Sequence, residues 1–304
     1  MSSPRSAPAQ HWPISERPEL IFPGDCRMAV YVGLNIEYFE FGKPSTSRSG
    51  VTAGLPIDPL NHAWREYGTR VGFWRMLEAI DHNKLPVSVL INSEAARQFP
   101  EIVGAGRERN WAFLGHGRTN SELWAGFDEE GERNAIAEIV KTLTETTGKS
   151  PQGWLGPALS ETDHTLRLLA EHGFRYSLDW VNDDQPYPLP VEGHKFASIP
   201  YSIEINDILA FIDDGISPEQ FGQMIIDQFE VLHEESKRRP GAVMCVALHP
   251  FLVGQAFRYK YLAAALDAIS GFSDVWYANS DEIADWYFAG PYDSAVKELG
   301  RRKG

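Results

Sequence analysis

The chain has 304 residues, of which 43% are hydrophobic and 23% charged, so it can bury the core of one sizeable domain. Its net charge of −14 argues against nucleic acid or an anionic membrane as a partner, because both demand a basic surface. The two cysteines, Cys26 and Cys245, are too few for a disulfide framework or a thiolate metal cluster. No apolar stretch approaches the roughly 18 residues of a membrane span, and the N-terminus lacks the apolar part of a signal peptide. We therefore expect a soluble, cytoplasmic protein.

Three regions differ in composition. Residues 1–25 are rich in Pro and Ser and predict an extended arm, which could be exchanged between subunits. Residues 26–290 predict a single catalytic domain, and residues 291–304 a C-terminal tail. Within the domain, residues 40–66 contain Gly, Ser and Pro without periodicity, which is typical of a lid or a substrate-binding loop.

Strand-like and helix-like segments alternate along most of the chain. Strands are expected at 28–36, 85–91, 111–115, 153–156, 174–179, 196–201, 242–249 and 275–278. Helices are expected at 71–82, from 93, at 128–148, 161–173, 217–238, 259–270 and from 280. This alternation predicts an α/β fold with a parallel sheet, either closed into a barrel or open and doubly wound. No Gly-rich phosphate loop follows the first strand, which argues against a nucleotide cofactor.

Four predicted strands end on a residue that can take part in chemistry. Glu37 follows MAVYVGLNI, His116 follows AFLG, Asp179 follows FRYSL and His249 follows VMCVAL. In a parallel barrel the carboxyl ends of the strands meet at one rim, so these residues could converge on one site. Each also has a structural interpretation, such as a satisfied core histidine or a loop cap, and for Asp179 the two readings are almost equally good.

The sequence also resembles a known family. It contains NIE at 35–37, YGTRVGFWR at 67–75, GHG at 115–117, TGKSPQGW at 147–154, IPYSIEIND at 199–207 and LHP at 248–250. Together these resemble the polysaccharide deacetylase superfamily, and most closely its allantoinase-type branch, whose members open small cyclic ureides or imides. The resemblance runs from about residue 10 to residue 288. It implies a distorted (β/α) barrel of about seven parallel strands and a homo-oligomer.

The resemblance also bears on metal binding. In the metal-using members an Asp pair closes the first strand, its first Asp acting as base and its second as ligand, and a His-x-x-x-His motif supplies two further ligands. Here Glu37 matches the first Asp, Tyr38 stands in place of the second, and His116 is followed by Asn120 in place of the second histidine. A catalytic zinc normally has three protein ligands, so we predict a site without metal. If a metal binds, its ligands would be His116, Asn120 and Glu37.

The expected chemistry is hydrolysis of a carbon–nitrogen bond in a small cyclic amide, imide or ureide. Glu37 would deprotonate a water, Asn120 would hold the oxyanion, and His249, poised by Asp179, would protonate the leaving nitrogen. Ala158 stands near the position where the allantoinase-type proteins carry an Arg, which favours a neutral ring. Substrate contacts are expected from Asn35, Tyr38, Asn120, Trp154, Ser160, Glu161 and Trp180, although core packing is an open alternative for the two tryptophans.

Two other functions remain open at this stage. One is a metal-dependent deacetylase acting on polysaccharides or N-acetylated sugars. The other is a relative that has lost catalysis and binds a small ligand.

Overall fold

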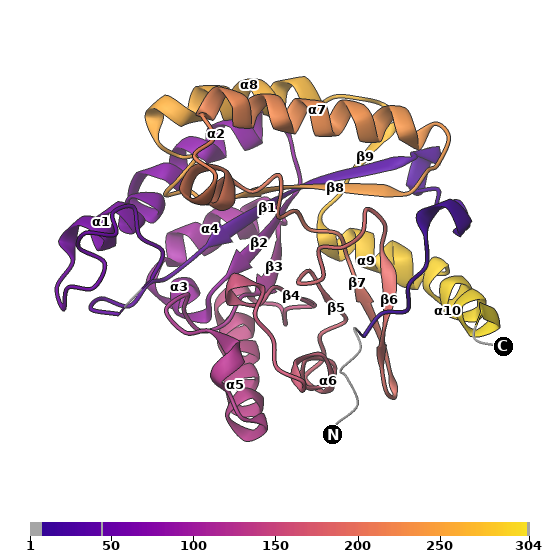
Figure 1. Cartoon of the computed structure of the whole chain (residues 1–304), viewed down its shortest axis with the longest axis horizontal. Helices are drawn as coiled ribbons and strands as arrows, with labels where there is room; N and C mark the ends of the chain where they lie inside the picture. The colour runs from indigo at the N-terminus through magenta and orange to yellow at the C-terminus, as the bar shows by residue number, and fades with distance from the viewer. Residues whose placement is uncertain (1–7, 44, 303–304) are drawn as a thin grey trace.

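The computed structural model describes residues 8–43 and 45–302 (Figure 1). Within these residues nine strands form one sheet, in the order β6-β7-β5-β4-β3-β2-β1-β8, and β9 pairs with β1 outside this path. The strands are β1 Met28–Ile36, β2 Val87–Ile91, β3 Ala112–Gly115, β4 Gly153–Trp154, β5 Tyr176–Ser177, β6 Tyr187–Val191, β7 His194–Ser198, β8 Ala242–Leu248 and β9 Val275–Tyr277. All pairings are parallel except that of β6 with β7.

The sheet curls into an incomplete barrel. Between β7 and β8 the chain at 199–207 replaces a regular strand, and a single bridge joins Asn206 to Ala247. Beside it, the backbone N–H of Ala247 donates to the carbonyl of Ile205 at 3.0 Å. The predicted distorted (β/α) barrel is therefore confirmed, although β6 is an antiparallel edge strand that the sequence analysis did not include.

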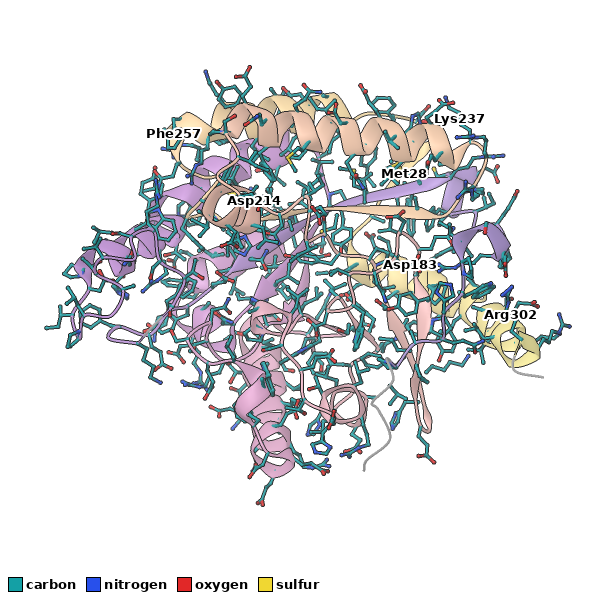
Figure 2. All side chains as sticks on the ribbon, in the orientation of Figure 1. Met28, Asp183, Asp214, Lys237, Phe257 and Arg302 are labelled. Atoms are coloured by element: carbon teal, nitrogen blue, oxygen red, sulfur yellow. The ribbon has the colours of Figure 1, made fainter. Side chains whose placement is uncertain are left out.

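Helices surround the sheet: α1 Pro59–Tyr67, α2 Phe73–Asn83, α3 Ser93–Gln98, α4 Pro100–Glu108, α5 Glu129–Thr147, α6 Thr165–Glu171, α7 Pro218–Ser236, α8 Ala256–Ile269, α9 Ser280–Phe288 and α10 Pro291–Arg302. Figure 1 shows α2, α7 and α8 grouped beside β1 and β8, with α5 and α6 on the opposite side of the molecule. Side chains fill the space between these layers (Figure 2). No helix in the described part of the chain has the length and apolarity needed to cross a membrane.

Local sequence determines where the long helices begin and end. Asp128 caps α5 by accepting from the backbone N–H of Gly131 at 2.8 Å, and Gly148 ends the same helix in the left-handed region at φ +83°. Ser217 and Gln220 form a reciprocal capping box at the start of α7. The predicted helix from Ser93 divides into α3 and α4, because Pro100 cannot continue α3.

The two predicted terminal regions pack on their own chain. In the arm, of which residues 1–7 lie outside the described residues, Trp12 is buried and the guanidinium of Arg17 pairs with the carboxylate of Asp183 at 2.5 Å. Of the predicted tail, residues 303–304 lie outside the described residues and 291–302 form helix α10, whose Tyr292 is buried against Tyr287 at a ring separation of 5.9 Å. The tail is thus part of the packed domain.

Candidate active site

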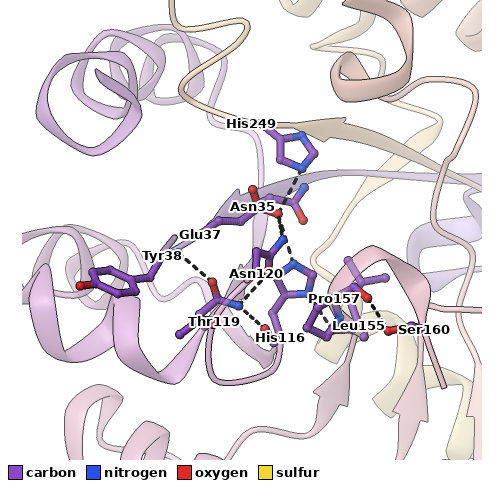
Figure 3. A network of polar contacts seen from close by, with 12 residues as sticks. Asn35, Glu37, Tyr38, His116, Thr119, Asn120, Leu155, Pro157, Ser160 and His249 are labelled. Atoms are coloured by element: carbon purple, nitrogen blue, oxygen red, sulfur yellow. Dashed lines mark hydrogen bonds and ion pairs between the residues drawn. The ribbon is translucent and has the colours of Figure 1, made fainter. Parts of the chain in front are cut away.

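Three of the four residues predicted at strand ends meet at one carboxylate. The Oε1 of Glu37, just after β1, lies 3.4 Å from Nε2 of His116, just after β3, and 3.6 Å from Nε2 of His249, just after β8. Figure 3 shows these side chains pointing toward one another. Their side chains are only 3%, 3% and 5% exposed, in the order Glu37, His116 and His249, so the cluster is shielded from bulk water.

Charge pairing sets the protonation of this cluster. Burial would raise the pKa of Glu37, but the positive charge on His249 outweighs it and holds the pKa at about 2. Burial would lower the pKa of His249, but the charges of Glu37 and Asp207 outweigh it and raise the pKa to about 10. At neutral pH, Glu37 is therefore an ionised carboxylate and His249 an imidazolium. This is an acceptor and a donor of protons side by side.

The partner of His249 is Asp207, which the sequence analysis did not select. The Nδ1 of His249 donates to Oδ1 of Asp207 at 2.7 Å, and the backbone N–H of His249 donates to Oδ2 at 3.0 Å. Asp207 is fully buried at the end of segment 199–207. The predicted pairing of His249 with Asp179 is therefore wrong. Asp207 ends the IPYSIEIND motif, which was noted for its resemblance but given no chemical role.

His116 is oriented through its other ring nitrogen. Its Nδ1 donates to the carbonyl of Leu155 at 2.7 Å, so in the neutral imidazole the lone pair is on Nε2, which faces Glu37. An acceptor nitrogen beside a carboxylate oxygen is a suitable place to hold a water molecule by both of its protons. His116 and Glu37 can therefore position a nucleophilic water.

Asn120 meets Glu37 as a hydrogen-bond donor. Its Nδ2 donates to Oε1 of Glu37, while its Oδ1 accepts from Nδ2 of Asn92 at 2.9 Å. The amide oxygen, which is the only atom of this side chain able to ligate a metal, is thus turned away from the carboxylate. Among the described residues no group of three or more His, Cys, Asp or Glu side chains could hold a metal ion. The set Glu37, His116 and Asn120 does not fit a catalytic divalent ion.

Asp179, just after β5, is not in contact with Glu37 or His249 and lies beside the loop that holds His116. Its Oδ1 accepts from the backbone N–H of Gly156 at 2.7 Å, next to the Leu155 carbonyl that holds His116. Burial raises the pKa of both Asp179 and Glu161, and the nearby charge of Asp179 further raises the pKa of Glu161. The pair lines a cavity of about 920 Å³ together with Trp180, whereas Glu37, His116 and His249 do not line it.

The remaining predicted contacts divide into two groups. Asn35 is close to the cluster, because its Nδ2 donates to the hydroxyl of Tyr201 at 3.0 Å and to the carbonyl of Leu248 at 3.2 Å. The ring of Tyr38 points away from Glu37 (Figure 3). Ser160 is engaged in its own turn, where its hydroxyl donates to the carbonyl of Pro157 at 2.7 Å.

Trp154 is a core residue and not a substrate contact. It is fully buried and packs edge to face on Trp124 and Phe174, at ring separations of 5.0 and 5.5 Å. The bulk of its indole fills the space beside Gly115, where a Cβ would lie 2.8 Å from the ring. The prediction that Trp154 binds substrate is therefore wrong, and the alternative of core packing holds.

The chain is similar to known deacetylases and to an allantoinase. Residues 66–177 match the family model for polysaccharide deacetylase. A peptidoglycan deacetylase of Helicobacter pylori is 25% identical over 256 residues, which cover 72% of this chain and 84% of that protein. The crystal structure of the Puue allantoinase is 27% identical with a TM-score of 0.83, and that of a probable polysaccharide deacetylase from Pseudomonas aeruginosa PAO1 is 29% identical with a TM-score of 0.82. Each structural alignment covers 91% of this chain and 96% of the other.

A curled parallel sheet with a carboxylate and two histidines at its carboxyl rim defines a hydrolase of carbon–nitrogen bonds. Residues 66–177 match the polysaccharide deacetylase model, and the chain as a whole is similar to a peptidoglycan deacetylase and to the solved structure of an allantoinase.

Proposed function

We propose that this enzyme opens a small cyclic amide, imide or ureide, and that it does so without a metal ion. The observation that carries the proposal is the contact of ionised Glu37 with protonated His249, at 3.6 Å between Oε1 and Nε2. Amide hydrolysis needs a base to activate water and an acid to protonate the departing nitrogen, and this pair supplies both. The donor orientation of Asn120 supports the part of the proposal that excludes a metal.

The proposed reaction has two steps. Glu37 takes a proton from a water held at Nε2 of His116, and the water oxygen forms a bond to the ring carbonyl carbon. The second N–H of Asn120, which the bond to Glu37 leaves free, donates to the developing oxyanion. The C–N bond then breaks, and the proton on Nε2 of His249 passes to the leaving nitrogen. Transfer of the proton from Glu37 to His249 restores the starting state.

The low proton affinity of Glu37 in the resting site is consistent with this order. His249 holds the pKa of Glu37 down only while it carries its own proton. As His249 gives that proton to the leaving group, Glu37 loses its cationic neighbour and retains the proton taken from water more firmly. The two groups therefore act as one unit, and neither can be replaced without affecting the other.

The nature of the ring is a narrower part of the proposal. Ala158, where the resemblance implies an arginine, provides no cation for an anionic substituent. A neutral imide or hydantoin-like ring is the substrate we favour. A metal-dependent deacetylase is the second candidate, because the similarity to a peptidoglycan deacetylase is also substantial; it would require a ligand set other than the one described above.

Replacement of Glu37 by Gln tests the role of the base, with Glu40→Gln as the matched control. Glu40 lies three residues further on and pairs with Arg118 at 2.7 Å, on the surface of the same segment. We expect Glu37→Gln to lower kcat for imide ring opening by roughly 10²–10⁴-fold with circular dichroism unchanged, and Glu40→Gln to stay near wild type. Full activity of Glu37→Gln would refute the assignment.

A further inference from the structure

Asn92 is a buried residue at the rim of the barrel that links three parts of the site. It follows β2 and is fully buried. Its Oδ1 accepts from the backbone N–H of Tyr38 at 2.7 Å, and its Nδ2 donates to the backbone carbonyl of His116. The same Nδ2 donates to Oδ1 of Asn120 at 2.9 Å. One amide therefore contacts the residues that follow β1, the residue that follows β3, and the side chain facing Glu37.

Two backbone groups, the N–H of Tyr38 and the carbonyl of His116, determine the orientation of the Asn92 amide. A backbone N–H can only donate and a backbone carbonyl can only accept, so the oxygen of Asn92 must face Tyr38 and its nitrogen must face His116. The nitrogen has a second proton, and Asn120 can accept it only through its oxygen. The nitrogen of Asn120 is then the atom left to face Glu37.

We propose that Asn92 is a positioning residue that locks the Asn120 amide with its N–H group toward Glu37. This inference concerns the same site as the proposed function and goes beyond it, because it names what keeps a donor, and not an acceptor, beside the catalytic carboxylate. A donor lowers the proton affinity of the carboxylate and leaves a second N–H for an oxyanion. An oxygen in its place would repel the carboxylate and would offer a ligand to a metal.

The substitution Asn92→Asp removes the donor at this position and changes little else in shape. The ionised carboxylate that it introduces can still accept from the backbone N–H of Tyr38, but it competes with Glu37 for the N–H group of Asn120. The amide of Asn120 can satisfy one carboxylate with its nitrogen only by turning its oxygen toward the other. The pKa of Glu37 should therefore rise in this variant.

Other groups that act on Glu37 remain in place in this variant. The titratable or charged side chains that face Glu37 are His116, His249, Tyr201 and Arg65, with Asp207 behind His249. The side chain of Asn92 hydrogen-bonds instead to Asn120 and to the backbone of Tyr38 and His116. A matched control is Asn279→Asp, because Asn279 is also buried but caps α9, where Asp serves equally well.

The test is a carboxyl ¹³C NMR titration of protein labelled in glutamate, with the Glu37 signal assigned by its loss in Glu37→Gln. It needs no substrate, so its outcome is independent of whether the proposed reaction occurs. We expect Asn92→Asp to raise the pKa of Glu37 by at least about one unit, a tenfold change in proton affinity, and Asn279→Asp to leave it unchanged. Asn120→Ala should also raise it, and adding Asn92→Asp to Asn120→Ala should produce less than about half of the shift seen in the wild-type background.

Two results would overturn the proposal: no shift in Asn92→Asp, or an equal shift when Asn120 is already replaced by Ala, which would show that the new charge acts directly. If Asn92→Asp does not fold, Asn92→Ser takes its place and the side-chain ¹⁵N–¹H signals of Asn120 are measured. We then expect a lower order parameter for this amide than in wild type. An equally ordered Asn120 amide would contradict the locking role.

Discussion

His249 donates from Nδ1 to Oδ1 of Asp207 over 2.7 Å, within a buried pair in which Asp207 also accepts the backbone N–H of His249. This contact fixes the orientation of the ring and directs the opposite nitrogen, Nε2, at Glu37. The acid of the proposed reaction is therefore oriented by one carboxylate and faces another. Both carboxylates keep it charged.

Asp207→Asn should shift the alkaline limb of the pH profile. Because Asp207 raises the pKa of His249, its neutralisation should lower the pH at which His249 loses its proton by at least about one unit. We expect kcat/KM to fall at a lower pH than in wild type. Asp179→Asn is the comparison, since Asp179 hydrogen-bonds to Gly156 and not to His249, and it should leave this limb in place. An alkaline limb that moves with Asp179 and not with Asp207 would support the pairing expected from sequence.

The Glu37 and His249 pair should make the stability of the fold depend on pH. The folded pKa of His249 is raised from 6.5 to about 10, so its contribution is complete below pH 6.5 and is lost as pH rises toward 10. The folded pKa of Glu37 is lowered from 4.5 to about 2, so its contribution is complete above pH 4.5 and is lost as pH falls toward 2.

Urea unfolding at about pH 7 and about pH 10 measures the alkaline part of this dependence. We expect the free energy of unfolding of wild type to fall between these values, and to fall less in Glu37→Gln, where His249 has lost one of its two anionic neighbours. The comparison between the two proteins removes the effect of the tyrosines and lysines that also titrate. An identical fall in both would mean that the pair is not coupled in the folded state.

Asn120→His should give the site a zinc set that the natural chain lacks. The variant would bring a second imidazole beside Glu37 and His116, and one carboxylate with two imidazoles is a common catalytic zinc set. Isothermal titration calorimetry should show saturable zinc binding to Asn120→His and none to wild type. Equally tight binding to wild type would show that the orientation of Asn120 does not exclude a metal.

Ala158→Gly should stabilise the turn that precedes Glu161. Ala158 lies in the left-handed region at φ +52°, ψ 32°, where a Cβ is unfavourable and glycine is not. We expect a gain of about 0.5–1 kcal/mol in the free energy of unfolding, measured with urea. The reverse change at Gly148, which has φ +83°, should destabilise by a similar amount. A loss of stability in Ala158→Gly would indicate that the methyl group contributes packing that outweighs the strain.

Much of the fold and half of the site could be predicted because both follow from the strand pattern. Glu37, His116 and His249 each come directly after an apolar run, and parallel strands bring their ends together. Asp207 could not be found in this way, because it ends an irregular segment that only the bridge from Asn206 to Ala247 brings beside β8.

Other features were missed for local reasons. The edge strand β6 contains Pro188 and Pro190, so its sequence is typical of a loop. Proline is tolerated in an edge strand but is rare in the central strands of a sheet. Asn92 also directly follows an apolar strand, as Glu37 does. It was not selected because an amide side chain is neutral and does not act as an acid or a base. Trp154 could not be separated from a pocket residue by sequence, because indoles serve both purposes.

Ring opening of succinimide, maleimide, hydantoin and allantoin by the purified protein in excess chelator decides whether the enzyme is a metal-free cyclic amide hydrolase. We predict turnover of at least one of these rings under chelation, and its loss in Glu37→Gln. Absence of turnover under chelation that is restored by zinc or cobalt would contradict metal-free catalysis and return the enzyme to the metal-dependent deacetylases.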